Sequence, residues 1–213
     1  MKTSVNIRRL NDKEVRYLRN QRSVQVRRRR SLWRRSLSGY IVIFGGLALL
    51  TYWAEIKNPK IIFSLWGILG AAISIPSFID EWRRLSRCIS DFDHALAQGI
   101  CEELVINSVR MWEFEEDDDE GACYAFELAT GGVIIVCGQD FYPGARFPNT
   151  DFSIIEIRDR KQNVLEMIVE KRGKKMIPER RVSAQEKKSI AIPEHGTLFP
   201  GSLEAVYGTL KNA

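Results

Sequence analysis

The sequence predicts an α+β membrane protein with three parts: a two-helix transmembrane hairpin, an amphipathic juxtamembrane helix, and a small antiparallel β-meander domain, barrel or sandwich-like, with a short C-terminal helix. Two uncharged apolar runs, Tyr40 to Ala54 and Ile61 to Ile79, predict the hairpin. Apolar residues at helical spacing over 81–99 predict the amphipathic helix. Short alternating segments separated by turn residues after Ile100 predict the β domain.

The β domain is expected to contain two clear hairpins. One joins strands at Cys123 to Leu128 and Val133 to Cys137 through a tight turn at Thr130-Gly131-Gly132, and the other joins strands at Ser153 to Arg158 and Val164 to Lys171. The run Val133 to Cys137 is apolar on both faces, so we expect it to be covered on both sides. Ser202 is expected to open the C-terminal helix.

These signals divide the chain into a basic tail (1–38), a hairpin (39–80, with spans at about 39–55 and 61–79), the amphipathic helix (81–99) and the β-rich domain (100–213). Basic residues flank the outer ends of both spans, and such residues stay on the cytoplasmic side. We therefore expect an integral, multi-pass membrane protein with both termini cytoplasmic.

The basic tail holds most of the positive charge of the protein. Residues 1–39 contain 13 Lys and Arg against Asp12 and Glu14, a local balance of +11, whereas the whole chain carries +5. Dense like charges make a packed core unexpected here, and the asymmetry indicates an anionic partner. The candidate contacts with anionic lipid headgroups are Arg27, Arg28, Arg29, Arg30, Trp33, Arg34 and Arg35. A topology signal is the simpler interpretation, and nucleic acid is disfavoured because no base-reading pattern accompanies the charges.

Small residues in the second apolar run recur at helical spacing. Gly67, Gly70, Ala71 and Ser74 follow an i, i+3, i+4, i+7 pattern, which places them on one face of a helix. Small side chains let helix backbones approach closely. This face is therefore a candidate helix-packing surface, either within the hairpin or in a homo-oligomer.

The β domain contains one unusual loop, residues 138–152. Pro143-Gly144 marks a turn, and the loop is rich in aromatic residues. One interpretation is that these rings cover an open end of the sheet. The other is a loop that binds a protein partner through Phe141, Tyr142, Arg146 and Phe147.

The sequence shows no spacing typical of a catalytic, nucleotide or metal site, so we predict no catalytic residues, no cofactor and no metal. The four cysteines lack CxxC spacing and are expected as free thiols. The function predicted is a membrane-anchored, non-catalytic binding or scaffold module, which presents the β-rich domain to an unidentified protein partner while the basic tail contacts anionic lipid. The alternatives are a membrane-associated enzyme that uses Cys123 or Cys137 with His195 and Asp140, and a structural membrane protein that oligomerises.

Overall fold

The computed structural model describes residues 5–53, 59–117 and 119–212, and of residues 51 and 59–63 it describes the backbone alone. The chain divides into two compact units. The β unit contains residues 1–9, 100–158 and 164–213, and the helical unit contains residues 10–99 and 159–163. Each unit is described by itself.

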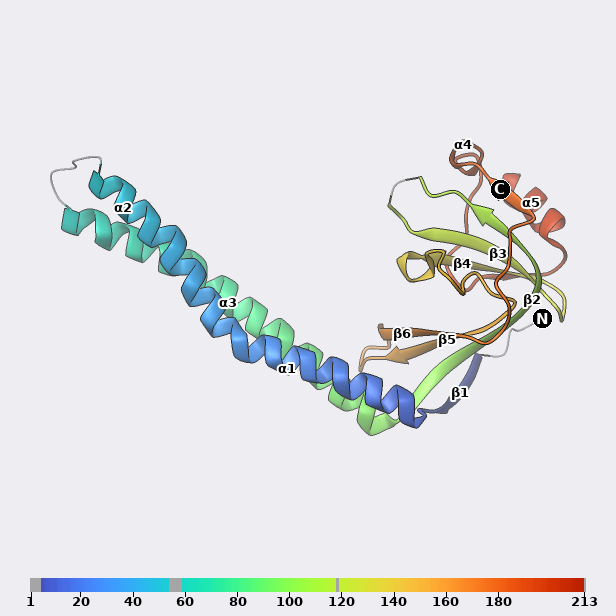
Figure 1. Cartoon of the computed structure of the whole chain (residues 1–213), viewed down its shortest axis with the longest axis horizontal. Coiled ribbons are helices and arrows are strands. Elements are labelled where there is room, and N and C mark those ends of the chain that lie inside the picture. Colours follow the sequence, from blue (N-terminus) through green and yellow to red (C-terminus); the bar gives the residue numbers. More distant parts are fainter. Residues whose placement is uncertain (1–4, 54–58, 118, 213) are drawn as a thin grey trace. The chain divides into compact units, whose positions relative to one another are not determined.

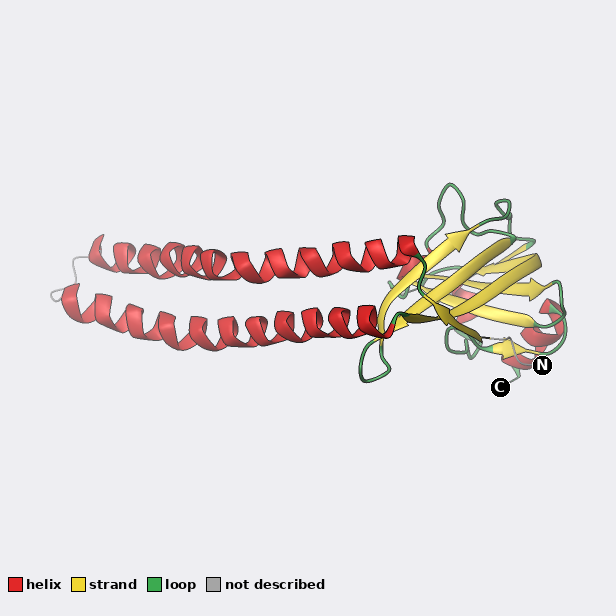
Figure 2. Ribbon diagram, turned by 90° about the horizontal axis from the view of Figure 1, so that it is seen from below, coloured by secondary structure: helices red, strands yellow, loops and turns green. Residues whose placement is uncertain are grey.

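The helical unit is an antiparallel pair of long helices (Figures 1 and 2). Its first arm is α1 (Asp12–Tyr40), which continues through one π-helical segment, η1 (Ile41–Gly45), into α2 (Gly46–Trp53). Its second arm is the single helix α3 (Pro59–Gln98), and Gly99, with φ of +63°, ends it. The amphipathic helix predicted after Asp80 is therefore the second half of α3 rather than a separate element.

Helix α1 begins at a capping box. The side chain of Asn11 accepts hydrogen bonds from the backbone N–H groups of Lys13 and Glu14, and the Glu14 carboxylate accepts one from the Asn11 N–H. The basic segment, which the charge density predicts to be unpacked, thus forms a 29-residue helix. Its arginines lie mostly on the exposed side, while Leu18 on the other side is fully buried.

The two arms pack through small and apolar residues. Near the charged ends, the side chains of Leu85, Ile89 and Phe92 are buried in the pair. Farther along, a Cβ atom on Gly70 would lie 2.7 Å from ring atoms of Tyr40 and Phe44, and the Tyr40 hydroxyl donates to the Gly67 carbonyl at 3.2 Å. Glycines on α3 therefore admit aromatic rings from the opposite arm.

The predicted transmembrane hairpin is not supported, and the membrane and multi-pass assignments and the integral localisation with cytoplasmic termini are corrected with it. Across the described ranges, no helix combines the length and the apolar composition that crossing a bilayer requires. Helix α2 has eight residues, and the apolar part of α3 continues without interruption into a half rich in acidic and basic residues. The predicted connector between the spans lies largely at 54–58, outside the described residues.

The β unit is a strongly bent, mainly antiparallel sheet with two peripheral helices, so the α+β class with an antiparallel sheet is confirmed. The strands are β1 (Val5–Arg9), β2 (Ile100–Phe114), β3 (Ala122–Leu128), β4 (Val133–Gly138), β5 (Asp151–Arg158), β6 (Val164–Lys171), β7 (Arg180–Val182) and β8 (Leu198–Phe199). The short helices are the 3₁₀ turn η2 (Gln139–Phe141), α4 (Ala184–Lys187) and α5 (Leu203–Lys211).

Strand β2 belongs to both halves of the sheet. Its residues 102–107 pair with β5, and its residues 108–114 pair with β3. The register shifts between Ser108 and Arg110, which is where the strand changes partner. Near its start β2 also pairs with β1, on the edge opposite β5, and near its end it pairs in parallel with β7, on the edge opposite β3.

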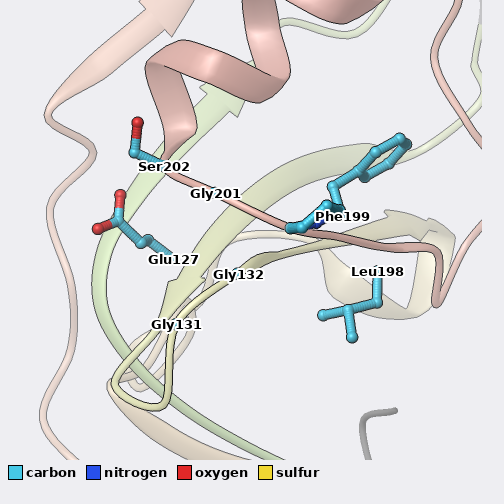
Figure 3. A pocket seen from close by; sticks show the side chains of 8 residues that line it. Glu127, Gly131, Gly132, Leu198, Phe199, Gly201 and Ser202 are labelled. Carbon is cyan, nitrogen blue, oxygen red and sulfur yellow. The ribbon is translucent and has the colours of Figure 1, made fainter. Parts of the chain in front are cut away.

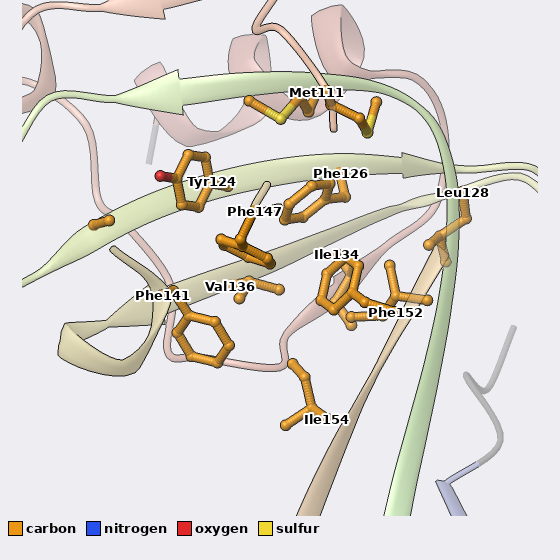
Figure 4. Packing of buried hydrophobic residues seen from close by; sticks show 13 residues of the cluster. Met111, Tyr124, Phe126, Leu128, Ile134, Val136, Phe141, Phe147, Phe152 and Ile154 are labelled. Carbon is orange, nitrogen blue, oxygen red and sulfur yellow. The ribbon is translucent and has the colours of Figure 1, made fainter. Parts of the chain in front are cut away.

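A first hydrophobic core fills the inside of the bend (Figure 4). It is dominated by aromatic rings, with Phe126 and Phe152 at 5.1 Å and Phe147 and Phe152 at 5.3 Å between ring centroids. Alternate residues of β4 serve two cores, because Ile134 and Val136 join this cluster while Val133 and Ile135 join a second one on the other face. The double coverage of this strand was expected from its unbroken apolar run.

Helix α5 covers the second core. Ser202 caps it by accepting a hydrogen bond from the Ala205 N–H, and Leu203, Val206 and Leu210 are buried against the sheet. The short C-terminal helix predicted from Ser202 is confirmed. The second core also contains Val182 of β7, which belongs to a stretch of predominantly polar sequence.

Candidate functional site

The predicted partner-binding loop has a buried part and an exposed part. Phe141 and Phe147 are each 1% exposed and belong to the first core, so their rings cover the open end of the sheet in this structure. Tyr142 and Arg146 are exposed. Tyr142 donates to the Glu116 carboxylate at 2.7 Å, which raises the pKa of Tyr142 to about 12. The surface that this loop offers a partner is therefore polar.

The helical unit carries a large exposed apolar surface, called here the apolar surface. Val42 is 73% exposed and Trp53 is 86% exposed. Fourteen of the described residues form it: Leu37, Ile41, Val42, Ile43, Leu49, Leu50, Tyr52 and Trp53 on one arm, and Leu65, Ile68, Leu69, Ile73, Ile75 and Ile79 on the other. Monomeric soluble proteins rarely expose apolar patches of this extent, and such patches mark interaction sites.

Arginines border the apolar surface on both arms; we call them the basic border. The exposed members are Arg27, Arg28, Arg30, Arg34 and Arg35 on α1 and Arg83, Arg84 and Arg87 on α3. Arg29 is partly buried instead, and its guanidinium carbon lies 5.2 Å from the centre of the Trp82 ring. Of the predicted headgroup contacts, Trp33 is 61% exposed, so it lies open beside these arginines.

The small-residue face predicted for helix packing is occupied within the helical unit. Gly67 and Gly70 lie against Tyr40 and Phe44, and Ala71 and Ser74 are partly buried. The side of α3 that faces outward is the apolar surface. A further helix would therefore meet large aliphatic side chains rather than glycines.

Three of the four candidate reactive residues, Cys123, Cys137 and His195, line one cavity of about 330 Å³. Its walls contain Cys123, Cys137, His195, Lys187 and Glu120. Cys123 and Cys137 form a disulfide, which differs from the free thiols expected from their spacing. Asp140 lies on η2 and is exposed; it does not line the cavity.

His195 is held inside the structure rather than poised as a base. Its Nδ1 accepts a hydrogen bond from the Cys137 backbone N–H at 3.2 Å, and its ring stacks on Phe141 at 5.0 Å. Burial lowers the pKa of His195, so the ring is neutral at pH 7 and carries its hydrogen on Nε2. Because Nδ1 already accepts this bond, that nitrogen does not take a proton from a thiol, and the predicted enzyme lacks its base there.

A second cavity, of about 430 Å³, lies where the turn between β3 and β4 meets β8 (Figure 3). Its one carboxylate, Glu127, accepts hydrogen bonds from Arg110 and from the Leu203 N–H. Gly132 has φ of +92°, and a Cβ there would lie 2.8 Å from the Phe199 carbonyl oxygen. Glu127 thus holds the start of α5, and the absence of a side chain at Gly132 lets the backbone of β8 approach the turn.

Comparisons of the chain with protein-family models, with curated proteins and with solved structures found no match.

Proposed function

We propose that this protein is a non-catalytic assembly module in which the helical unit associates with a second copy of itself and the β unit is the part presented to other molecules. The observation that carries the proposal is the apolar surface, because fourteen large side chains exposed on two adjacent helices are costly to leave in water. In the cavity that Cys123, Cys137 and His195 line, the two thiols form a disulfide and His195 Nδ1 already accepts a hydrogen bond, which supports a binding role over the predicted cysteine enzyme.

Several features favour a second copy as the occupant. The apolar surface extends along both arms of one antiparallel helix pair, so two copies can bury it in a four-helix arrangement. Two-fold pairs are the commonest protein oligomers, and in them the same patch is buried on both chains.

The basic border sets the direction of the pairing. In a parallel pair, the arginines of one copy would lie next to those of the other, and like charges repel. In an antiparallel pair, the basic border of each copy lies near the opposite end of its partner's apolar surface. We therefore propose the antiparallel arrangement.

Sedimentation equilibrium of the full chain in detergent-free buffer tests the proposal. We expect the wild type to be dimeric at micromolar concentration and Ile68→Glu to be largely monomeric, because Ile68 belongs to the apolar surface and is 70% exposed. Ser77→Glu, at an exposed polar position of the same helix, is the matched control and should remain dimeric. Self-association would be refuted by a wild type that remains monomeric when the protein concentration is raised 100-fold above the micromolar range.

Vesicles distinguish the predicted lipid contact from self-association. If the chain is monomeric and sediments with anionic phospholipid vesicles, and if Arg27→Gln/Arg28→Gln/Arg30→Gln abolishes that sedimentation, the surface and its basic border serve lipid and the dimer proposal fails. A dimer that does not sediment with the vesicles supports the proposal and contradicts the headgroup contact predicted for these arginines.

A further inference from the structure

We propose that the Cys123–Cys137 pair is a thiol–disulfide exchange site for small thiols, with Cys137 as the sulfur that the incoming thiol attacks. The proposal concerns the β unit alone and does not depend on how the helical unit associates. It rests on the position of the pair in the sheet, the cavity beside it and the unequal exposure of its two sulfurs.

The two cysteines are joined by the register of adjacent strands. Cys123 of β3 lies directly opposite Cys137 of β4, with their Cα atoms 4.0 Å apart and a sequence separation of 14. The strands also pair at five further positions, from Ala122–Gly138 to Glu127–Val133. Because these backbone contacts do not depend on the sulfurs, the strands can remain paired when the disulfide is opened.

Access to the two sulfurs is unequal. Cys123 is 1% exposed and belongs to the second core, whereas Cys137 is partly exposed near the end of β4. Both line the cavity of about 330 Å³, whose other walls come from Gly138 and from the segment that holds Pro193 and His195. A small thiol entering this cavity therefore meets Cys137 more readily than Cys123.

The cavity also contains one ammonium group among its described lining residues, that of Lys187. Lys187 is 6% exposed, and its ammonium group pairs with Glu120 and donates to the Glu115 carbonyl at 3.4 Å. Glu120 and Glu194 line the same cavity, so carboxylates balance the Lys187 charge. The unequal exposure of the two sulfurs, rather than this charge, therefore selects Cys137 as the sulfur that is attacked.

The exchange balances as a two-electron reaction. The thiolate of one small thiol attacks Sγ of Cys137, forms a mixed disulfide and releases Cys123 as a thiolate. The thiolate of a second small thiol attacks the small-molecule sulfur of this mixed disulfide, which releases Cys137 and a small-molecule disulfide. The two thiols are oxidised, the protein disulfide is reduced, and the two thiol protons end on Cys123 and Cys137.

Two variants, each of which keeps one cysteine of the pair, test the assignment. Cys123→Ser and Cys137→Ser, each in the full chain, are treated with oxidised glutathione without denaturant, and the modified peptide is followed by mass spectrometry. We expect Cys137 in the first variant to be modified at least tenfold faster than Cys123 in the second. The proposal would be overturned if the two cysteines were modified at equal rates, or if Cys137 were modified only after urea is added. Circular dichroism of both variants establishes that each one is folded.

The native protein gives the second measurement. Reduced glutathione is added to the air-oxidised wild type, and free thiols are trapped with N-ethylmaleimide. We expect labels on both Cys123 and Cys137 while the β-sheet signal is retained. A pair that is found unlinked in the air-oxidised chain, or that opens only together with loss of the sheet signal, contradicts an exchange site.

Discussion

Replacing Gly70 by Ala tests whether the small-residue face of α3 is used inside the helical unit. A Cβ at this position would lie 2.7 Å from Cγ of Phe44 and 2.7 Å from Cε2 of Tyr40, both closer than carbon atoms approach. Displacing packed rings costs about 1–3 kcal/mol. The same substitution gains about 0.5–1 kcal/mol because Ala is a better helix former than Gly. We expect Gly70→Ala to lower the free energy of unfolding by about 1 kcal/mol.

Gly67→Ala is the matched control, one turn away on the same face. Its nearest neighbour would be the Tyr40 hydroxyl oxygen at 3.8 Å, an ordinary contact. The gain in helix propensity then remains, and this variant should be more stable than the wild type by about 0.5–1 kcal/mol. Since the propensity gain is common to both, the difference between the two variants isolates the packing cost, about 1–3 kcal/mol.

The measurement is urea unfolding followed by circular dichroism at 222 nm, at one fixed protein concentration because association adds to apparent stability. The helical unit supplies most of the helical residues and therefore most of this signal. Shifts of the same sign and size in the two variants would refute the packing of Gly70 against Tyr40 and Phe44.

Three further predictions concern the β unit. Cys123→Ala/Cys137→Ala should lower its stability in denaturant by about 3 kcal/mol, since a cross-link that closes a loop of about 15 residues restricts the unfolded chain by that amount; an unchanged denaturation midpoint would contradict the cross-link. Burial lowers the pKa of His195, so the unfolded state binds its proton first as pH falls below about 6.5, and thermal stability should fall through that range; His195→Asn, which keeps an acceptor but does not titrate, should reduce the dependence. Tyr124→Phe should raise the free energy of unfolding by about 1 kcal/mol, because the Tyr124 hydroxyl is buried without a hydrogen-bond partner in the described structure. A variant with a clearly lower melting temperature would show that this hydroxyl does make a stabilising hydrogen bond.

Local signals were sufficient for much of the β unit. The strands β5 and β6 and the helix α5 were predicted because alternation, a turn between them and a capping serine are all short-range features. Strand β7 was not predicted, since only its Val182 is buried and its neighbours are polar. A three-residue strand whose pairing depends on distant β2 leaves little trace in its own sequence.

The transmembrane hairpin was predicted wrongly because the two apolar runs were judged without the charged residues that continue the same helices. The basic segment carries a readable start signal, Asn11 followed three residues later by Glu14. Like charges that repel in a compact tail are tolerated on one side of a helix when the other side is packed. The apolar side chains of Leu85, Ile89 and Phe92 are buried, and α3 packs against α1, a segment in which no packed core was expected.

The site was partly within reach of sequence. The turn around Thr130 was predicted, and Cys123 and Cys137 each lie seven residues from it, so a hairpin centred there places them opposite one another. His195 was named with these cysteines in the enzyme alternative, and the structure brings it to the same cavity. No sequence signal indicated that Lys187, the last residue of the short helix α4, would join them. Phe141 and Phe147 lie in the first core, as expected from the interpretation in which the rings of this loop cover the open end of the sheet.

The pairing of β1 with β2 gives the helical unit a second role, as an insertion. Arg9 and Ile100 are partners in the register, so the 90 residues between them occupy the position of a hairpin loop. The antiparallel arms bring the ends of that insertion together, and the Leu10 N–H donates to the Gly99 carbonyl at 2.9 Å. Closing an unstructured loop of that length costs about 3 kcal/mol more entropy than closing a two-residue turn. When the two arms pair, they bring residues 10 and 99 together, so most of this loop-closure entropy is lost before β1 pairs. Strand β1 can then join the sheet as if a short turn connected it to β2.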